Sequence, residues 1–212
     1  MKQIILLIFI FSNVNAYEFK LNKKDLDFIY SSKKRNFIVN RLNKYQSIKK
    51  KVVDYTLIRK LSHINLFLNK ILPANDIKTK STLDHWATPK EFLIEGYGDC
   101  EDYAIAKYFT LIELGIKKEN MYFAVVDVKG AKNTHMILLY VEDKNKSPLV
   151  LDNLSFKVIP LSKRKKLIPK FAFNETNAYK FTHDKFTQKI NIHWGKENKW
   201  EKLLKRVYKL KE

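Results

Sequence analysis

The sequence predicts an α+β fold in which helices come first and an antiparallel sheet follows. Residues 34–50 and 54–72 carry apolar side chains at the three- and four-residue spacing of amphipathic helices. Residues 121–128, 135–141 and 149–154 are instead rich in β-branched and aromatic residues and are joined by short polar connections. Helices and strands that are separated along the chain in this way are typical of the α+β class.

The helical half contains two further segments with clear boundary signals. Thr88-Pro89-Lys90-Glu91 is a capping box with proline at the first helical position, and it predicts a short helix that ends at Gly96. Residues 100–114 are apolar on nearly every side, so this helix is expected in the centre of the fold. Pro73 is expected to stop the helix over residues 54–72.

The C-terminal third has weaker signals. Residues 157–196 predict short strands and basic loops, and residues 199–210 predict an amphipathic helix through Trp200, Leu203 and Val207. The chain has 212 residues, 45% of them hydrophobic, without repeats or Pro/Gly-rich linkers. One domain over residues 17–212 is therefore expected.

The first sixteen residues have the pattern of a secretory signal peptide. Lys2 precedes an apolar stretch from Ile4 to Phe11, and small or polar residues lead to Ala16. The apolar stretch is too short to span a bilayer, and no second run of spanning length follows. We therefore expect cleavage after Ala16 and an exported chain with no transmembrane segment in its mature form.

The formal net charge of +19 raises the question of an anionic partner. The positive residues gather in runs at 33–35, 49–51 and 163–166. These runs lack interleaved aromatic residues and any nucleic-acid-binding motif. We interpret them as solvated faces of the protein, and nucleic acid is not an expected partner.

Cys100 is the only cysteine, so it cannot form an internal disulfide. It follows Gly98 and Asp99, and Asp99 is a good helix N-cap with Asp102 three residues later. Cys100 then lies in the first helical turn, where free N–H groups and the helix dipole favour a thiolate. This setting predicts a reactive thiol; the alternative is a buried structural cysteine.

A cysteine nucleophile needs a base and a group that orients the base. His135 begins the second predicted strand and Asp152 ends the third. If Asp152 pairs with Ile137, it lies on the same face as His135 and diagonal to it, about 7 Å away between Cβ atoms. A hydrogen bond between them is then expected; alternatively, each side chain only satisfies its own strand end.

The sequence resembles the bacterial transglutaminase-like cysteine proteinases, including the LapG-type periplasmic proteases. The resemblance is carried by the segment Gly98-Asp99-Cys100-Glu101-Asp102-Tyr103-Ala104, by Trp86 to Glu91 before it, and by Thr134-His135-Met136 and Leu151-Asp152-Asn153 after it. The resemblance is most specific over residues 84–153. It implies a papain-like or transglutaminase-like fold with the cysteine helix packed on the sheet. It also implies a catalytic triad of Cys100, His135 and Asp152.

The resemblance further implies a biological role. The expected substrate is a large surface adhesin, cut at an N-terminal di-alanine site in the periplasm so that the biofilm disperses. The expected partner is a LapD-like inner-membrane receptor for cyclic-di-GMP. Two alternatives stay open: a thiol acyltransferase or amidase acting on cell-wall peptides, which would use the same triad, and a non-catalytic calcium-dependent binding module.

Three acids crowd the nucleophile and would raise the pKa of the thiol unless a cation offsets them. The resemblance implies that Asp99, Glu101 and Asp102 bind Ca²⁺, with Tyr97 standing where relatives can have a further acid. Alternatively, the acids only stabilise the helix N-terminus. The backbone N–H of Cys100 is the expected oxyanion donor, with Trp86 or His85 as candidates for the second.

Overall fold

The computed structural model describes residues 17–74, 85–195 and 197–208. The signal peptide predicted for residues 1–16 lies outside these described residues, as does the end of the helix predicted to reach residue 210. None of the helices in the described ranges is long and apolar enough to cross a membrane.

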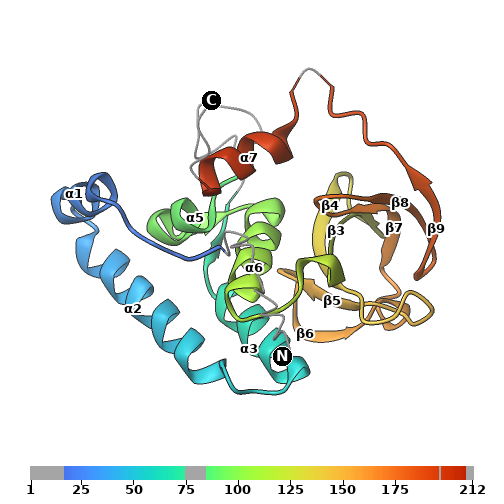
Figure 1. Cartoon of the computed structure of the whole chain (residues 1–212), viewed down its shortest axis with the longest axis horizontal. Helices are drawn as coiled ribbons and strands as arrows, with labels where there is room; N and C mark the ends of the chain where they lie inside the picture. The colour runs from blue at the N-terminus through green and yellow to red at the C-terminus, as the bar shows by residue number, and fades with distance from the viewer. Residues whose placement is uncertain (1–16, 75–84, 196, 209–212) are drawn as a thin grey trace, which may run out of the picture.

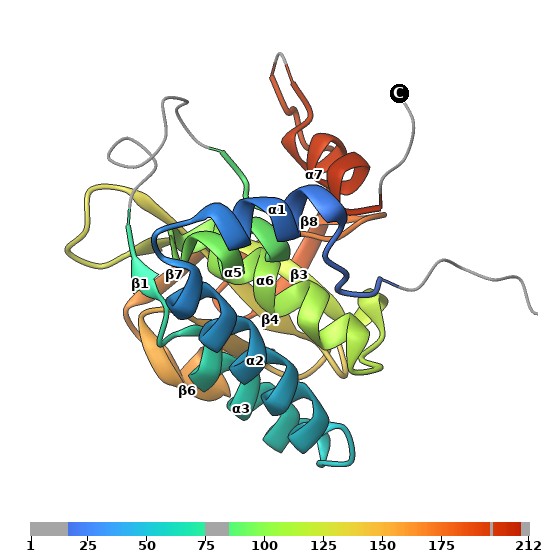
Figure 2. The ribbon, with the colours of Figure 1, turned by 90° about the vertical axis from the view of Figure 1, so that its left-hand side faces the viewer.

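The helices of the N-terminal half form a layer on one side of the molecule (Figure 1). They are α1 (Lys23–Ser31), α2 (Arg35–Val52), α3 (Leu57–Leu68), α5 (Pro89–Glu95) and α6 (Cys100–Glu113). Helix α6 is central, because it contacts α3 and α5 on one side and strands β4 (Thr134–Tyr140) and β5 (Leu149–Asp152) on the other. Figure 2 shows α1 and α2 on the outside of this layer. Helix α1 was not predicted.

Helix boundaries agree with the local signals except in α3. Helix α5 has the predicted Thr88 capping box, and Gly96 ends it with a left-handed φ of 79°. Helix α3 runs from Leu57 to Leu68, so it begins three residues later and ends four residues earlier than predicted, with Asn69 as its C-cap. The chain then enters β1 (Leu72–Pro73), which pairs in parallel with β2 (Tyr97–Gly98) directly before α6.

The main sheet has seven strands in the order β6-β5-β4-β3-β7-β8-β9, and every neighbouring pair is antiparallel. Besides β4 and β5 it contains β3 (Met121–Val128), β6 (Ser155–Pro160), β7 (Leu167–Phe173), β8 (Ala178–Thr182) and β9 (Lys185–Ile190). The meander β3-β4-β5 follows the predicted strands closely. Short 3-10 helices η1 (Lys118–Asn120) and η2 (Leu161–Lys163) precede β3 and follow β6.

Both faces of the sheet are buried. Leu138 and Tyr140 of β4 point into a large core shared with the helices, whereas Ile137 and Leu139 belong to a second core inside the curled sheet. Helix α7 (Lys199–Tyr208) closes the helical core, where Trp200 stacks on Phe109 of α6 at 6.3 Å between ring centroids. The observed α+β arrangement confirms the predicted fold class.

Candidate active site

The start of α6 is built by hydrogen bonds to one buried carboxylate. Asp99 is the N-cap, and its N–H donates to Asp102 Oδ2 at 3.3 Å, while Ala87 N–H donates to Asp102 Oδ1 at 2.7 Å. Gly98 permits this packing, because a Cβ there would lie 2.6 Å from Asp102 Oδ2. Cys100 is therefore the first residue of α6, as the N-cap pattern predicted.

The thiol of Cys100 is held in its protonated form in this arrangement. Its Sγ donates to Glu101 Oε2 at 2.9 Å and accepts a hydrogen bond from the backbone N–H of Met136 in β4. Burial, together with the charges of Glu101 and Asp99, raises the pKa of Cys100 above its ordinary value, and the Met136 N–H only partly offsets them. The acids next to the nucleophile thus act as the sequence predicted.

His135 and Asp152 form the expected hydrogen-bonded pair. The β4–β5 register pairs Leu138 with Leu151, and continuing it places Asp152 opposite Ile137, as predicted. His135 Nε2 lies 2.8 Å from Asp152 Oδ1. Because an ionised carboxylate only accepts hydrogen bonds, Nε2 carries the proton and Nδ1 is left as the basic nitrogen.

Cys100 and His135 line the same cleft, which has a volume of about 530 Å³. Its walls come from β1, the start of α6, the β3–β4 connection and the turn after β5. Neither His85 nor Trp86 lines this cleft. Their side chains are engaged elsewhere, since His85 lies 3.2 Å from Arg206 and the Trp86 ring packs against Phe173 and Trp194.

Asp152 is fully buried, and two cations that sequence reasoning missed act on it. Arg164 Nη2 donates to Asp152 Oδ2 at 2.5 Å. Burial alone would raise the pKa of Asp152, but His135, the Leu154 N–H and Arg164 together lower it to about 2. Lys107 of α6 is buried as well; desolvation lowers its pKa to about 7, although the charge of Asp152 acts in the opposite direction.

The turn after Asp152 is fastened to α3. Asn69 donates from its amide Nδ2 to the carbonyl oxygens of Asp152 at 2.7 Å and Ser155 at 3.0 Å. The Asn65 amide, one helical turn earlier, donates to Ser155 O at 2.8 Å. The sequence signal for this contact was an asparagine pair four residues apart, Asn65 and Asn69, on the face of α3 that buries Leu61 and Leu68.

Two of the three predicted calcium ligands, Glu101 and Asp102, form hydrogen bonds within the protein, and the assignment of Asp99, Glu101 and Asp102 to Ca²⁺ stays a prediction. Asp102 is fully buried and accepts hydrogen bonds from two backbone N–H groups, and Glu101 accepts a hydrogen bond from the Cys100 thiol. Within the described ranges no group of three or more His, Cys, Asp or Glu side chains is arranged to hold a metal ion. Carboxylate oxygens are nevertheless the donors that Ca²⁺ prefers.

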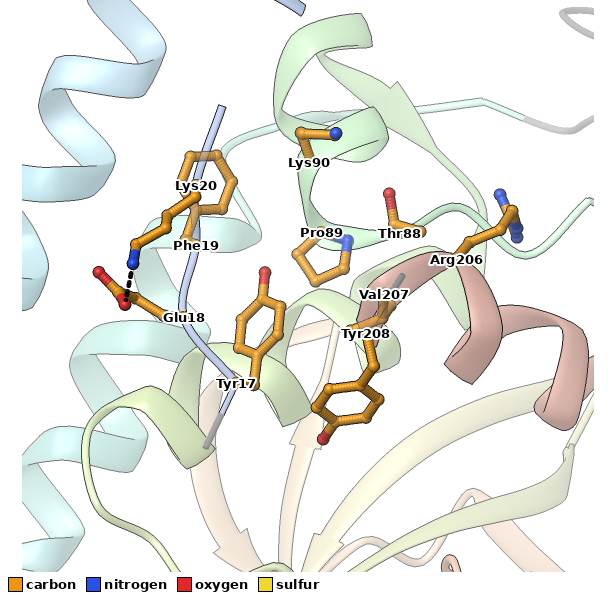
Figure 3. A pocket seen from close by; sticks show the side chains of 10 residues that line it. All are labelled: Tyr17, Glu18, Phe19, Lys20, Thr88, Pro89, Lys90, Arg206, Val207 and Tyr208. Carbon is orange, nitrogen blue, oxygen red and sulfur yellow. Dashed lines mark ion pairs between the residues drawn. The ribbon is translucent and has the colours of Figure 1, made fainter. Parts of the chain in front are cut away.

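A separate cavity of about 400 Å³ lies between residues 17–20, the start of α5 and the end of α7 (Figure 3). Its cationic side chains are neutralised by acids: Lys20 pairs with Glu18 at 2.7 Å, and Lys90 pairs with Asp25 at 2.8 Å. It shares no lining residue with the cleft that contains Cys100. We therefore place the candidate active site at the cleft.

The α+β fold, with a cleft that holds Cys100 and a His135 bonded to Asp152, is that of the transglutaminase-like cysteine proteinases, and comparison with known proteins agrees. Residues 38–167 match the bacterial transglutaminase-like cysteine proteinase (BTLCP) family, and the chain belongs to that family. A comparison with curated protein sequences found no match.

Solved structures of LapG from Legionella pneumophila are similar to this chain. The EGTA-treated form has a TM-score of 0.71 at 26% identity, covering 87% of this chain and 96% of LapG. The calcium-bound form has a TM-score of 0.68 at 26% identity, covering 87% and 97%. A further LapG structure has a TM-score of 0.70 at 26% identity, covering 91% and 98%.

Proposed function

We propose that this protein is a periplasmic cysteine endopeptidase that cuts a large surface adhesin at an N-terminal di-alanine site and so disperses biofilm. The observation that carries the proposal is the cleft that Cys100 and His135 line together. His135 is hydrogen-bonded there to the buried carboxylate of Asp152. Family membership supports peptidase chemistry. The adhesin and the di-alanine site are inferred from the similarity to LapG.

The chemistry follows from the geometry of three side chains. Cys100 transfers its proton to His135 Nδ1, because Nε2 already bonds Asp152. The thiolate attacks the scissile carbonyl, and the backbone N–H of Cys100 at the start of α6 stabilises the oxyanion. His135 then protonates the leaving amine, and water hydrolyses the thioester. Before this reaction can begin, the hydrogen bond from the Cys100 thiol to the Glu101 carboxylate must break.

Calcium dependence is part of the proposal. It is supported by the chemistry of the carboxylates at 99, 101 and 102 and by the calcium-bound and EGTA-treated structures of LapG. A bound cation would offset negative charge beside Cys100. Binding through these residues requires Glu101 to turn away from the thiol, so calcium should change the environment of Cys100 as well as the stability of the protein.

Product analysis tests the proposed activity. The protein is incubated with an adhesin peptide that contains a di-alanine site and, separately, with cell-wall peptide fragments, and the products are identified by mass spectrometry. We expect two hydrolytic fragments from the adhesin peptide alone. Transfer of the acyl half to an added amine, or release of amide from the cell-wall fragments only, would instead establish the acyltransferase or amidase alternative.

The proposed location and partner have their own test. Export is expected to remove residues 1–16, so the N-terminus of protein recovered from the periplasm should be Tyr17. A LapD-like inner-membrane receptor should retain the protein when cyclic-di-GMP is bound and release it otherwise. Recovery of the chain in the cytoplasm with Met1 intact would contradict this part of the proposal.

A further inference from the structure

Arg164 differs from its neighbours in the basic run at 163–166. The side chains of Lys163, Lys165 and Lys166 are exposed, as expected for a solvated face. The Arg164 side chain is only 15% exposed and forms an ion pair with Asp152. One residue of a run that looks like surface therefore reaches the buried end of the proposed triad.

The backbone around Arg164 is built to hold it there. Arg164 N–H donates to Leu161 O at 2.8 Å, and Arg164 O accepts from Leu167 N–H at 2.8 Å. Leu161 and Leu167 are both buried in the second core of the sheet. The side chain thus starts from a segment anchored on both sides, which lowers the entropy cost of placing a long guanidinium.

Arg164 and His135 divide the carboxylate of Asp152 between them. Oδ1 accepts from His135 Nε2 and from Leu154 N–H at 2.9 Å, whereas Oδ2 accepts from Arg164 Nη2. A carboxylate held on both oxygens cannot rotate about its terminal bond without breaking a contact. Its Oδ1 is therefore fixed in line with the imidazole.

Three charged or titratable groups face Asp152: His135 from β4, Arg164 from the segment between η2 and β7, and Lys107 from α6. His135 changes charge during the proposed reaction, and the pKa of Lys107 is lowered to about 7 by burial. Of these three kinds of side chain, only a guanidinium is in general charged at every working pH. A guanidinium beside a carboxylate therefore offsets its charge throughout that range.

We propose that Arg164 is a positioning residue of the active site: its guanidinium fixes the orientation of the Asp152 carboxylate, and through Asp152 it sets the tautomer and orientation of the His135 ring. The proposal rests on the proposed peptidase function for its kinetic consequence. The contact itself is independent of any substrate, so the two can be tested separately.

The kinetic test uses cleavage of a fluorogenic peptide with a di-alanine site. Arg164→Gln should lower kcat by about 10- to 100-fold, the loss seen when a partner that orients a metal-bound histidine is removed, with KM changed by less than about twofold. The acidic limb of its kcat profile should move to higher pH, because Asp152 is protonated more easily without the cation. Arg164→Lys should restore part of both values.

The matched control is Lys165→Met, which removes a neighbouring positive charge that makes no ion pair with Asp152. It should leave kcat and the pH profile unchanged. An equal loss in Lys165→Met would show that only the overall charge matters. Wild-type kcat and an unmoved acidic limb in Arg164→Gln would also overturn the proposal.

An NMR measurement tests the role of Arg164 without any catalytic turnover. The Nε2–H proton of His135 should appear as a downfield resonance through its bond to Asp152, and it should shift or disappear in Arg164→Gln while staying in place in Lys165→Met. If no form cleaves the peptide, the proposed function fails and the resonance still reports on Arg164. If Arg164→Gln does not fold, an unshifted resonance and wild-type kcat profile in Arg164→Lys, which alters the hydrogen-bond geometry, would refute the proposal.

Discussion

Replacing Asp152 with asparagine should destabilise the protein in a pH-dependent manner. The pKa of Asp152 falls from its ordinary 3.8 to about 2 in the folded protein. At about 1.4 kcal/mol per pKa unit, the ionised carboxylate contributes about 2 kcal/mol to the free energy of unfolding. Asparagine has nearly the same shape as the protonated acid, so Asp152→Asn should lose about this amount at neutral pH.

The sign of the pH dependence follows from proton binding. The unfolded chain binds more protons at this site between about pH 2 and pH 4, so the contribution is complete above pH 4 and disappears as the pH falls to 2. Urea unfolding followed by tryptophan fluorescence, in EGTA, measures both ends of this range. The exposed Asp54→Asn variant is the control and should behave as wild type.

A stability difference between wild type and Asp152→Asn that is the same at pH 7 and at pH 3 would contradict this prediction. Such a result would mean that packing, and not the ionised carboxylate, accounts for the loss. No difference at pH 7 would equally contradict the contribution derived from His135 and Arg164.

Two further predictions concern the residues around the nucleophile. Asp102→Ala should lower Tm in EGTA as well as in calcium, because it removes two hydrogen bonds to backbone N–H groups. Glu101→Gln should reduce only the rise in Tm that calcium produces. Equal changes of Tm in the two variants would contradict these separate roles. The pKa of Lys107 is lowered to about 7, so the unfolded chain binds more protons between pH 7 and 10.5 and stability rises with pH there. Relative to Lys107→Met, wild type should gain about 2 kcal/mol in urea unfolding between pH 7 and pH 9, and parallel stabilities would refute the assignment.

Local signals in the sequence predicted the parts of the site that depend on neighbouring residues. The Asp99 cap placed Cys100 at the first turn of α6, and strand parity placed His135 and Asp152 on one face. Both features follow from hydrogen bonding within a few residues or from the two-residue repeat of a strand. These are constraints that a single sequence expresses directly.

Contacts between distant segments could not be predicted in this way. Arg164 reaches Asp152 only because Leu161 and Leu167 are buried in the second core, and Asn69 reaches the same turn only because α3 ends beside it. A run of four basic residues has the same composition whether or not one of them is buried. The single arginine among lysines was the remaining signal, since arginine is the favoured residue for buried ion pairs.

The rate at which the Cys100→Ala variant cleaves the di-alanine peptide tests the role of Cys100 as the nucleophile. It is measured beside wild type at equal concentration, with circular dichroism spectra that match. Because the proposed reaction passes through a thioester on Cys100, the variant should fold normally and show no cleavage above the uncatalysed rate. Cleavage by Cys100→Ala at a rate near that of wild type would contradict the assignment of this cleft as the active site.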